Sequence, residues 1–119
     1  MKMEAPPKPC GECPWRTDVR TGRFPAERFR QMAHTAADMD RGLFQCHRTR
    51  TDRPLVCAGF LQKGADHNMT VRLAYVRGDL ESMDRSGGLP LYDGYREMAQ
   101  ANGVDPQDPA LEQCRSRAE

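Results

Sequence analysis

Apolar residues recur at helical spacing after Pro25, at Phe29, Met32, Ala33 and Ala36. Positions three and four residues apart share one face of an α-helix, so these side chains form one apolar stripe. Proline suits the first helical position, because its missing N–H has no partner there in any helix. The pattern therefore predicts a helix that begins at Pro25 and stops near Gly42.

Two short apolar runs follow this helix. Residues 43–47, Leu-Phe-Gln-Cys-His, are partly β-prone and predict a brief strand. Residues 55–61, Leu-Val-Cys-Ala-Gly-Phe-Leu, are apolar throughout. They fit a strand or a buried helical turn, because periodicity does not separate the two in so short a run. We favour a helix that begins near Cys57.

A further helix is predicted over residues 69–77, because Asn68 is a good N-cap. Its inward side chains would be Met69, Leu73 and Val76. The alternative is a strand that carries Val71, Leu73 and Tyr75 on one face. We favour the helix.

The last part of the chain predicts a loop and two helices. Residues 84–90 contain two consecutive glycines and predict the loop. Asp93 predicts the cap of a helix that ends near residues 102–103. Asp108, followed by Pro109, predicts the start of a short C-terminal helix that runs through Cys114.

These elements predict a mainly α fold with a few short strands, a small α+β domain. The 119 residues suit one domain. We expect residues 1–9 to form a flexible proline-rich tail and residues 10–119 to form a single metal-binding domain. Only 38% of the residues are hydrophobic and the mean hydropathy is −0.81. The core is therefore lean, and a bound metal would help to stabilise it.

The candidate chemistry lies in the cysteines. Cys10 and Cys13 are separated by two residues, Cys46 is followed by His47, and Cys57 comes ten residues after His47. A CxxC pair places both sulfurs on one ion, with backbone amides pointing at the thiolates. We predict one metal site in a compact fold organised around this cysteine knuckle. A redox pair and ordinary structural cysteines are the alternatives.

The predicted ligands are Cys10, Cys13 and Cys46, with Cys57 as the fourth and His47 as its alternative. Thiolates with or without one imidazole suit Zn²⁺, which we favour. A [4Fe-4S] cluster is the alternative, because it also takes four thiolates and a Cys-Pro step is common among its ligands. Cys114 is expected to be a small buried apolar residue. Its alternative role is that of a substitute metal ligand.

Trp15 and a group of arginines surround the cysteines. Trp15 either packs over the metal site or offers a stacking surface to a base or a partner side chain. The arginine rim, Arg16, Arg20, Arg23, Arg48, Arg50 and Arg53, is either a solvated surface or a contact patch for anionic groups. If it is a contact patch, Arg16, Arg48 and Arg50 are its binding residues, with Asp18 and Asp52 close enough in sequence to neutralise them.

Charge and missing motifs narrow the function. The net charge is +1, although residues 1–60 hold 11 Lys and Arg against 7 Asp and Glu. This bias is weak for a dedicated DNA-binding domain. No signal peptide, membrane span or familiar catalytic motif is found. We therefore expect a cytoplasmic, non-catalytic binding or regulatory module that acts on a protein partner, with nucleic acid as the alternative partner and no membrane role. An iron–sulfur protein that senses redox state or transfers electrons is the alternative function.

The blocks Pro9-Cys10-Gly-Glu-Cys13-Pro-Trp-Arg16, Cys46-His47 and Cys57-Ala-Gly59 resemble an uncharacterised family of short proteins. That family occurs in bacteria, notably actinobacteria, and in bacteriophages, and shares PCxxCPxR, CH and CAG blocks. The resemblance covers roughly residues 9–75. It implies that the cysteines form one site and that the protein belongs to a phage or prophage setting, where host machinery would be the natural partner. It implies no activity.

Overall fold

Short helices joined by long irregular segments make up the computed structural model, which describes residues 3–46 and 55–116. Its helices are α1 (Ala26–Met32), α2 (Ala58–Lys63), α3 (Met69–Arg77) and α4 (Tyr95–Ala101), with the 3-10 helices η1 (Ala33–Ala36) and η2 (Pro109–Leu111). Within the described residues, β structure is limited to isolated antiparallel bridges. The mainly α expectation is therefore confirmed. The strand predicted at residues 43–47 is reduced to one bridge, between Gln45 and Val56.

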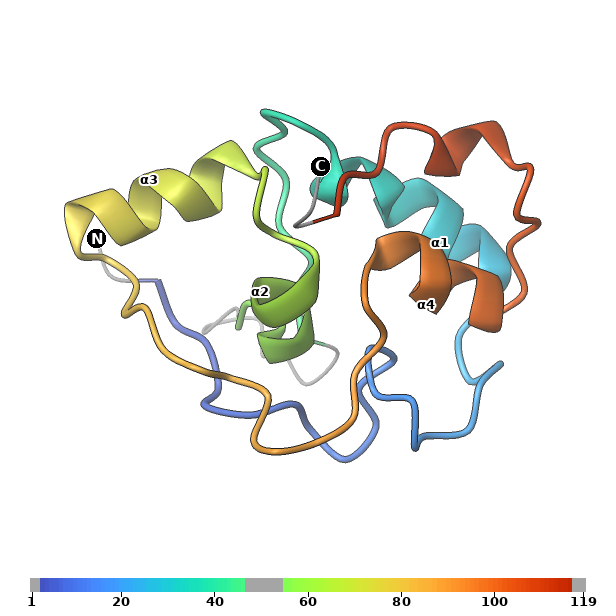
Figure 1. Cartoon of the computed structure of the whole chain (residues 1–119), viewed down its shortest axis with the longest axis horizontal. Coiled ribbons are helices and arrows are strands. Elements are labelled where there is room, and N and C mark those ends of the chain that lie inside the picture. Colours follow the sequence, from blue (N-terminus) through green and yellow to red (C-terminus); the bar gives the residue numbers. More distant parts are fainter. Residues whose placement is uncertain (1–2, 47–54, 117–119) are drawn as a thin grey trace.

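The helices form a single compact body. The radius of gyration is 13.3 Å, close to the roughly 13.5 Å expected for a globular chain of this length. In Figure 1, α1, α4 and η2 lie together on one side, α3 lies on the other, and α2 lies between them. Among the described residues, no helix is long and apolar enough to cross a membrane.

The first helix is shorter than predicted. Pro25 is its N-cap, with φ −66° and ψ 144°, and not its first helical residue. The chain tightens into η1 and leaves the helix at Ala37, where ψ is 156°. The prediction that the helix reaches Gly42 is wrong, because a distant segment pairs with this end: Ala37 bridges to Cys114, and Arg115 N–H donates to Ala36 O at 2.8 Å.

Helices α2 and α3 begin where they were predicted. Cys57 is the N-cap of α2, and Asn68 caps α3 by accepting a hydrogen bond from Val71 N–H. The predicted inward face of α3 is wrong. Val71 and Ala74 are buried, while Val76 is 84% exposed. The buried side chain of Asn68 donates to the carbonyls of Thr35 and Gly42, and these contacts fix the rotation of the helix that follows.

The two C-terminal elements differ from prediction in their bounds. Helix α4 has Gly94, and not Asp93, as its N-cap, and it ends at Asn102 and Gly103 as predicted. Asp108 caps η2 as predicted, but η2 is one 3-10 turn that ends at Leu111. Cys114 therefore lies beyond the helix. It is buried, as expected, with its Sγ 3.5 Å from Ala33 O.

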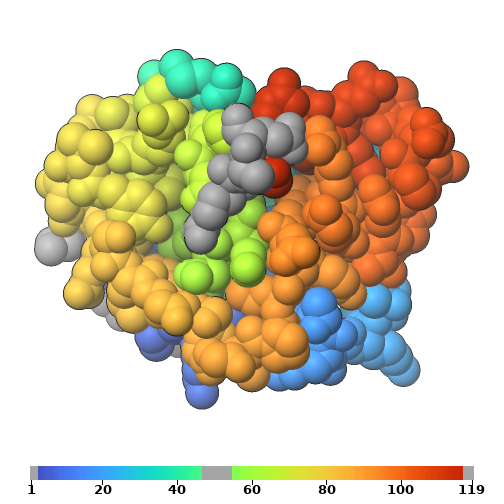
Figure 2. Space-filling model, viewed as in Figure 1, coloured from blue at the N-terminus to red at the C-terminus, as the bar shows by residue number. Residues whose placement is uncertain are grey.

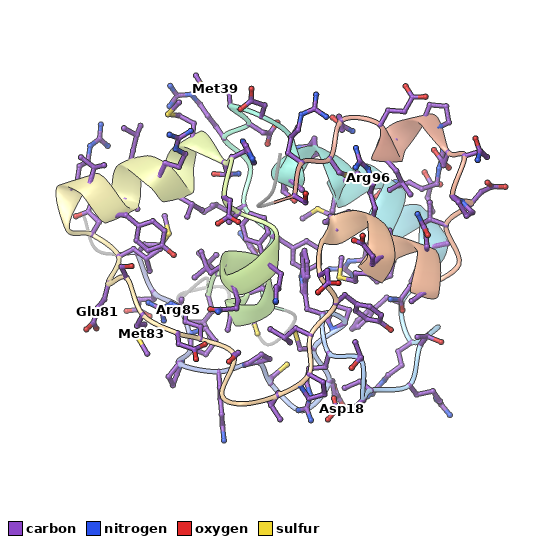
Figure 3. All side chains as sticks on the ribbon, in the orientation of Figure 1. Asp18, Met39, Glu81, Met83, Arg85 and Arg96 are labelled. Carbon is purple, nitrogen blue, oxygen red and sulfur yellow. The ribbon has the colours of Figure 1, made fainter. Side chains whose placement is uncertain are left out.

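The proline-rich N-terminal segment, expected to be flexible, runs alongside the segment that follows α3 (Figure 1). Met3 N–H donates to Asp79 O at 2.9 Å, and Val56 N–H donates to Glu4 O at 3.0 Å. Arg85, labelled in Figure 3, is 5% exposed and donates to the carbonyls of Pro6 and Glu81. In the space-filling view the blue N-terminal residues and the gold to orange residues after α3 form one edge of the surface (Figure 2).

An aromatic cluster forms the centre of the core. Trp15 is fully buried, and its ring meets Phe44 and Tyr95 edge-on at centroid distances of 5.9 and 5.7 Å. Tyr95 Oη donates to Phe29 O at 2.6 Å, and burial raises the pKa of this hydroxyl. Trp15 is thus a core residue with no exposed face for stacking on a base, and its packing over a metal site stays a prediction.

Candidate metal centre

Four cysteines line one cavity of about 350 Å³. Cys10 and Cys13 come from the loop before α1, Cys46 follows the aromatic core residue Phe44, and Cys57 precedes α2. The rest of the wall is mainly apolar and includes Phe24, Phe29, Met32, Leu43 and Phe44. The fold therefore brings together the four residues that the sequence singled out as a ligand set.

A local antiparallel pairing positions the last two cysteines. Cys46 N–H donates to Leu55 O at 2.8 Å, and Cys57 N–H donates to Phe44 O at 2.9 Å. These bonds flank the bridge between Gln45 and Val56. Because the two segments are paired by their backbones, Cys46 and Cys57 are held near each other although ten residues separate them.

The sulfur atoms are arranged as two pairs. Cys13 Sγ lies 3.6 Å from Cys57 Sγ, and the Cys10 side chain is hydrogen-bonded to that of Cys46. A disulfide would need about 2.05 Å, so Cys13 and Cys57 are both reduced. Two thiolates on one tetrahedral zinc ion, each about 2.3 Å from the metal, lie about 3.8 Å apart. The Cys13–Cys57 spacing therefore fits two ligands of one ion.

The structure does not show a closed metal knuckle. Within residues 3–46 and 55–116, no three or more His, Cys, Asp or Glu side chains are gathered closely enough to hold a metal ion. What it shows is two thiol pairs on the wall of one cavity. His47, the alternative fourth ligand, lies outside the described residues, as do Arg48 and Arg50.

Backbone amides point at the sulfurs of the knuckle. Hydrogen bonding from Cys57 lowers the pKa of the Cys13 thiol, and the N–H groups of Trp15 and Gly59 lower it further, while burial opposes them. The complementary effect appears at Cys57, whose pKa is raised well above its usual value by the hydrogen bond to Cys13 and by burial. This pair is therefore suited to carrying one negative charge, on Cys13.

Cys10 differs from the other three ligand candidates in its exposure. It is half-buried, whereas Cys13, Cys46 and Cys57 are buried. Burial raises the pKa of the Cys10 thiol, and the backbone N–H of Glu12 acts in the opposite direction. Amide groups thus serve both sulfurs of the CxxC turn, as expected for a turn that presents thiolates to a metal.

Two arginines of the described part of the rim, Arg16 and Arg23, form ion pairs with carboxylates. Arg16 makes a two-bond pair with Asp18, at 2.8 Å for each bond, and donates to Cys10 O at 3.2 Å. Arg23 pairs with Glu12 at 2.9 Å. Asp18, labelled at the lower edge of Figure 3, neutralises Arg16 as the sequence suggested. Arg16 therefore braces the cysteine loop, through a backbone carbonyl of Cys10.

Sequence analysis missed one charged residue of the cavity wall. Arg28 lies on α1, lines the cavity, and places its guanidinium 5.8 Å from the centre of the Phe24 ring. Phe24 and Arg28 are four residues apart around the start of α1, and this spacing was the available signal. Phe24 and Arg28 line the same cavity as the cysteines because of the way α1 packs, and this packing could not be predicted from their spacing in the sequence.

Comparison with known proteins identifies a family and no further relative. The model of a family of unknown function, DUF6283, matches residues 5–115. The match includes all four candidate ligands and extends well beyond the residues that carried the resemblance. Neither the curated proteins nor the solved structures that were searched contain a match to the chain.

Proposed function

We propose that this chain, which belongs to the family of unknown function DUF6283, is a small metal-binding module that holds one zinc ion through Cys10, Cys13, Cys46 and Cys57. The observation that carries the proposal is the 3.6 Å separation of Cys13 Sγ and Cys57 Sγ. These residues lie 44 positions apart, and no disulfide joins them. A shared ion accounts for two buried thiols held at this spacing.

The environment suits an anionic metal–thiolate group. Zinc with four thiolates carries a net charge of −2, which must be stabilised in an apolar cavity. The amides of Glu12, Trp15 and Gly59 supply hydrogen bonds to the sulfurs of Cys10 and Cys13. The Arg16 guanidinium adds a favourable electrostatic contribution at Cys13. Donor type and surroundings both fit zinc.

The proposed role of the metal is structural. Four thiolates fill the tetrahedral positions of zinc and leave none for a substrate. The ion would join the N-terminal loop, the segment that contains Cys46 and the start of α2. Binding of a structural zinc ion contributes directly to folding free energy, which is valuable in a chain whose helices are this short.

An iron–sulfur cluster is the second candidate, favoured by the size of the cavity. A cavity of about 350 Å³ exceeds the needs of one ion. The 3.6 Å spacing favours zinc over a [4Fe-4S] cluster, because each thiolate of that cluster binds a different iron and the sulfurs lie farther apart.

Native mass spectrometry and elemental analysis of the anaerobically purified protein test the proposal. We expect one zinc ion per chain, lost in Cys13→Ser and in Cys57→Ser and retained in the matched control Cys114→Ser. A folded metal-free protein with reduced thiols would overturn the proposal. Detection of iron and sulfide, together with visible absorbance, would support an iron–sulfur cluster, the second candidate, in place of zinc.

We also propose that the module acts on a protein partner and is not an enzyme. Three large apolar side chains, Met39, Val76 and Met83, are exposed on the described surface, and methionine is a residue type enriched in protein interfaces. Two of them, Met39 and Met83, are labelled in Figure 3. Buried Trp15 and ion-paired Arg16 are unsuited to base stacking and phosphate contact. Salt-dependent binding of a labelled oligonucleotide would overturn this choice in favour of nucleic acid.

A further inference from the structure

We propose that mild oxidation of this protein joins its cysteines between distant segments, Cys10 to Cys46 and Cys13 to Cys57, and thereby releases the metal. The pairing rests on the 3.6 Å separation of Cys13 Sγ and Cys57 Sγ and on the side-chain contact between Cys10 and Cys46. Release of the metal rests on the proposed function. The inference therefore adds a redox-dependent modification to the candidate metal centre.

The geometry selects a pairing that the sequence does not. A CxxC motif by itself predicts a disulfide between Cys10 and Cys13. In the structure, Cys13 Sγ faces Cys57 Sγ at 3.6 Å and Cys10 is hydrogen-bonded to Cys46. Closing the Cys13–Cys57 pair to the 2.05 Å of a disulfide requires an approach of about 1.6 Å.

Backbone contacts hold Cys13 toward Cys57 and the start of α2. The amide of Gly59, in the first turn of α2, is hydrogen-bonded to the sulfur of Cys13, as is the amide of Trp15. A disulfide from Cys13 to Cys57 keeps the sulfur of Cys13 beside these donors. Because these contacts already hold Cys13 beside Cys57, we infer that the cross-segment pair is favoured.

Exposure decides where oxidation begins. Cys10 is half-buried, while its partner Cys46 is 6% exposed and Cys13 and Cys57 are 1% and 3% exposed. A small peroxide therefore meets Cys10 first. The sulfur of Cys10 attacks one peroxide oxygen and the O–O bond breaks. The departing hydroxide takes up a proton, from the Cys10 thiol or, where Cys10 is a zinc-bound thiolate, from solvent, so the products are a sulfenic acid on Cys10 and one water molecule.

The second step forms the disulfide. The sulfur of Cys46 attacks the sulfenic sulfur of Cys10, the S–O bond breaks, and the hydroxide leaves as water. Its proton comes from Cys46 in the metal-free protein and from solvent where Cys46 is a zinc-bound thiolate. Two thiols and one hydrogen peroxide, or two thiolates, two solvent protons and one hydrogen peroxide, thus give one disulfide and two water molecules. A second equivalent of peroxide converts Cys13 and Cys57 by the same route. Loss of the first two thiolates leaves the ion with half of its ligands, which is insufficient for a structural zinc site.

The test is titration of the purified, metal-loaded protein with hydrogen peroxide, followed by disulfide mapping. Trypsin together with a glutamate-specific protease separates all four cysteines, because Glu12 lies between Cys10 and Cys13 and arginines lie between Cys46 and Cys57. We expect linked peptides Cys10–Cys46 and Cys13–Cys57. We also expect about one zinc ion per chain to appear in a chromogenic chelator assay as the first disulfide forms. Cys114→Ser, which removes the fifth thiol, should give the same map.

The outcomes separate this inference from the proposed function. A Cys10–Cys13 disulfide as the main product overturns the pairing, even if the reduced protein binds zinc. Retention of zinc after both cross-segment disulfides have formed overturns the release. If the reduced protein carries no metal, the proposed function fails, and the same digest of the metal-free protein still decides the pairing.

Discussion

Gly59 and Trp15 are packed so closely that position 59 has no room for a side chain. A Cβ atom built on Gly59 would lie 2.5 Å from Trp15 Cβ and 2.7 Å from its Cγ. Gly64, one α2 turn further on, is similarly close to the far end of the indole. The backbone of α2 therefore lies flat against Trp15, and this contact joins the aromatic core to the loop that contains Cys13.

Gly59→Ala should destabilise the protein by about 2 kcal/mol, because relieving the clash moves either α2 or Trp15 and overpacking typically costs 1–3 kcal/mol. The effect should appear in chemical denaturation as a lower midpoint with an unchanged slope. Gly11→Ala is the matched control, because a Cβ at Gly11 meets no atom within 4 Å. Equal midpoints for the two variants would show that the close contact is not rigid.

Cys13→Ser and Cys114→Ser should differ sharply in stability, although both remove one buried thiol. Cys114 packs near Ala33 O and lies outside the cavity, so its substitution should cost about 1–2 kcal/mol. Loss of a zinc ligand should cost several kcal/mol, because structural zinc binding is worth roughly 10 kcal/mol or more. Thermal melting with and without a chelator measures both effects. If both variants have the same melting temperature and the chelator changes neither value, the grouping of Cys13 with the zinc ligands is wrong.

Asn68→Ala should cost about 2–4 kcal/mol, because it leaves buried backbone groups without partners. The Asn68 amide donates to Thr35 O and Gly42 O and accepts from Val71 N–H, and the residue is fully buried. Urea denaturation measures the loss. Asn68→Asp keeps the acceptor and loses both donors, so it should be destabilised as well. Gln100→Ala, an exposed change on α4, serves as the surface control.

The carboxylate of Asp108 should make the stability of the protein depend on pH in the acidic range. Its pKa is lowered by the backbone N–H of Ala110 and by Arg30, which lies 2.6 Å away. Because the folded pKa lies below the unfolded value, this contribution is present above the unfolded pKa of about 3.9. It is lost as pH falls through the folded pKa.

Asp108→Asn isolates the charge, because asparagine is also a good N-cap. We expect a lower melting temperature than wild type at pH 7 and a difference that disappears toward pH 2. Melting curves across this range measure it. A difference that stays constant with pH would assign the effect to the cap and not to the carboxylate.

The local signals in the sequence determined where three of the helices begin. Cys57, Asn68 and Asp108 were predicted as starting positions, and each is an N-cap in the structure. Capping depends on one side chain and the next few amides, so it can be read from a few neighbouring residues. The CxxC spacing likewise determined a tight turn with amides aimed at sulfur.

Tertiary contacts decided how far the helices extend and which faces they bury. Helix α1 and its 3-10 extension end at Ala36 because the segment around Cys114 pairs there. Val76 points to solvent because Asn68 is anchored to Thr35 and Gly42. The partners in both cases lie at least 26 residues away, and periodicity within one element carries no information about them.

The sequence by itself determined that Cys10, Cys13, Cys46 and Cys57 were the candidates for one site, because their residue type and spacing suit thiolate ligands. Only the tertiary structure decided which sulfur faces which. It placed Cys13 against Cys57 across 44 residues of chain, and Cys10 against Cys46. The location of Trp15 was also decided by the tertiary structure, because an aromatic residue beside a metal motif suits a surface or a core equally well. Here Gly59 of α2, Gly64 directly after that helix, and the rings of Phe44 and Tyr95 pack against Trp15, which is fully buried.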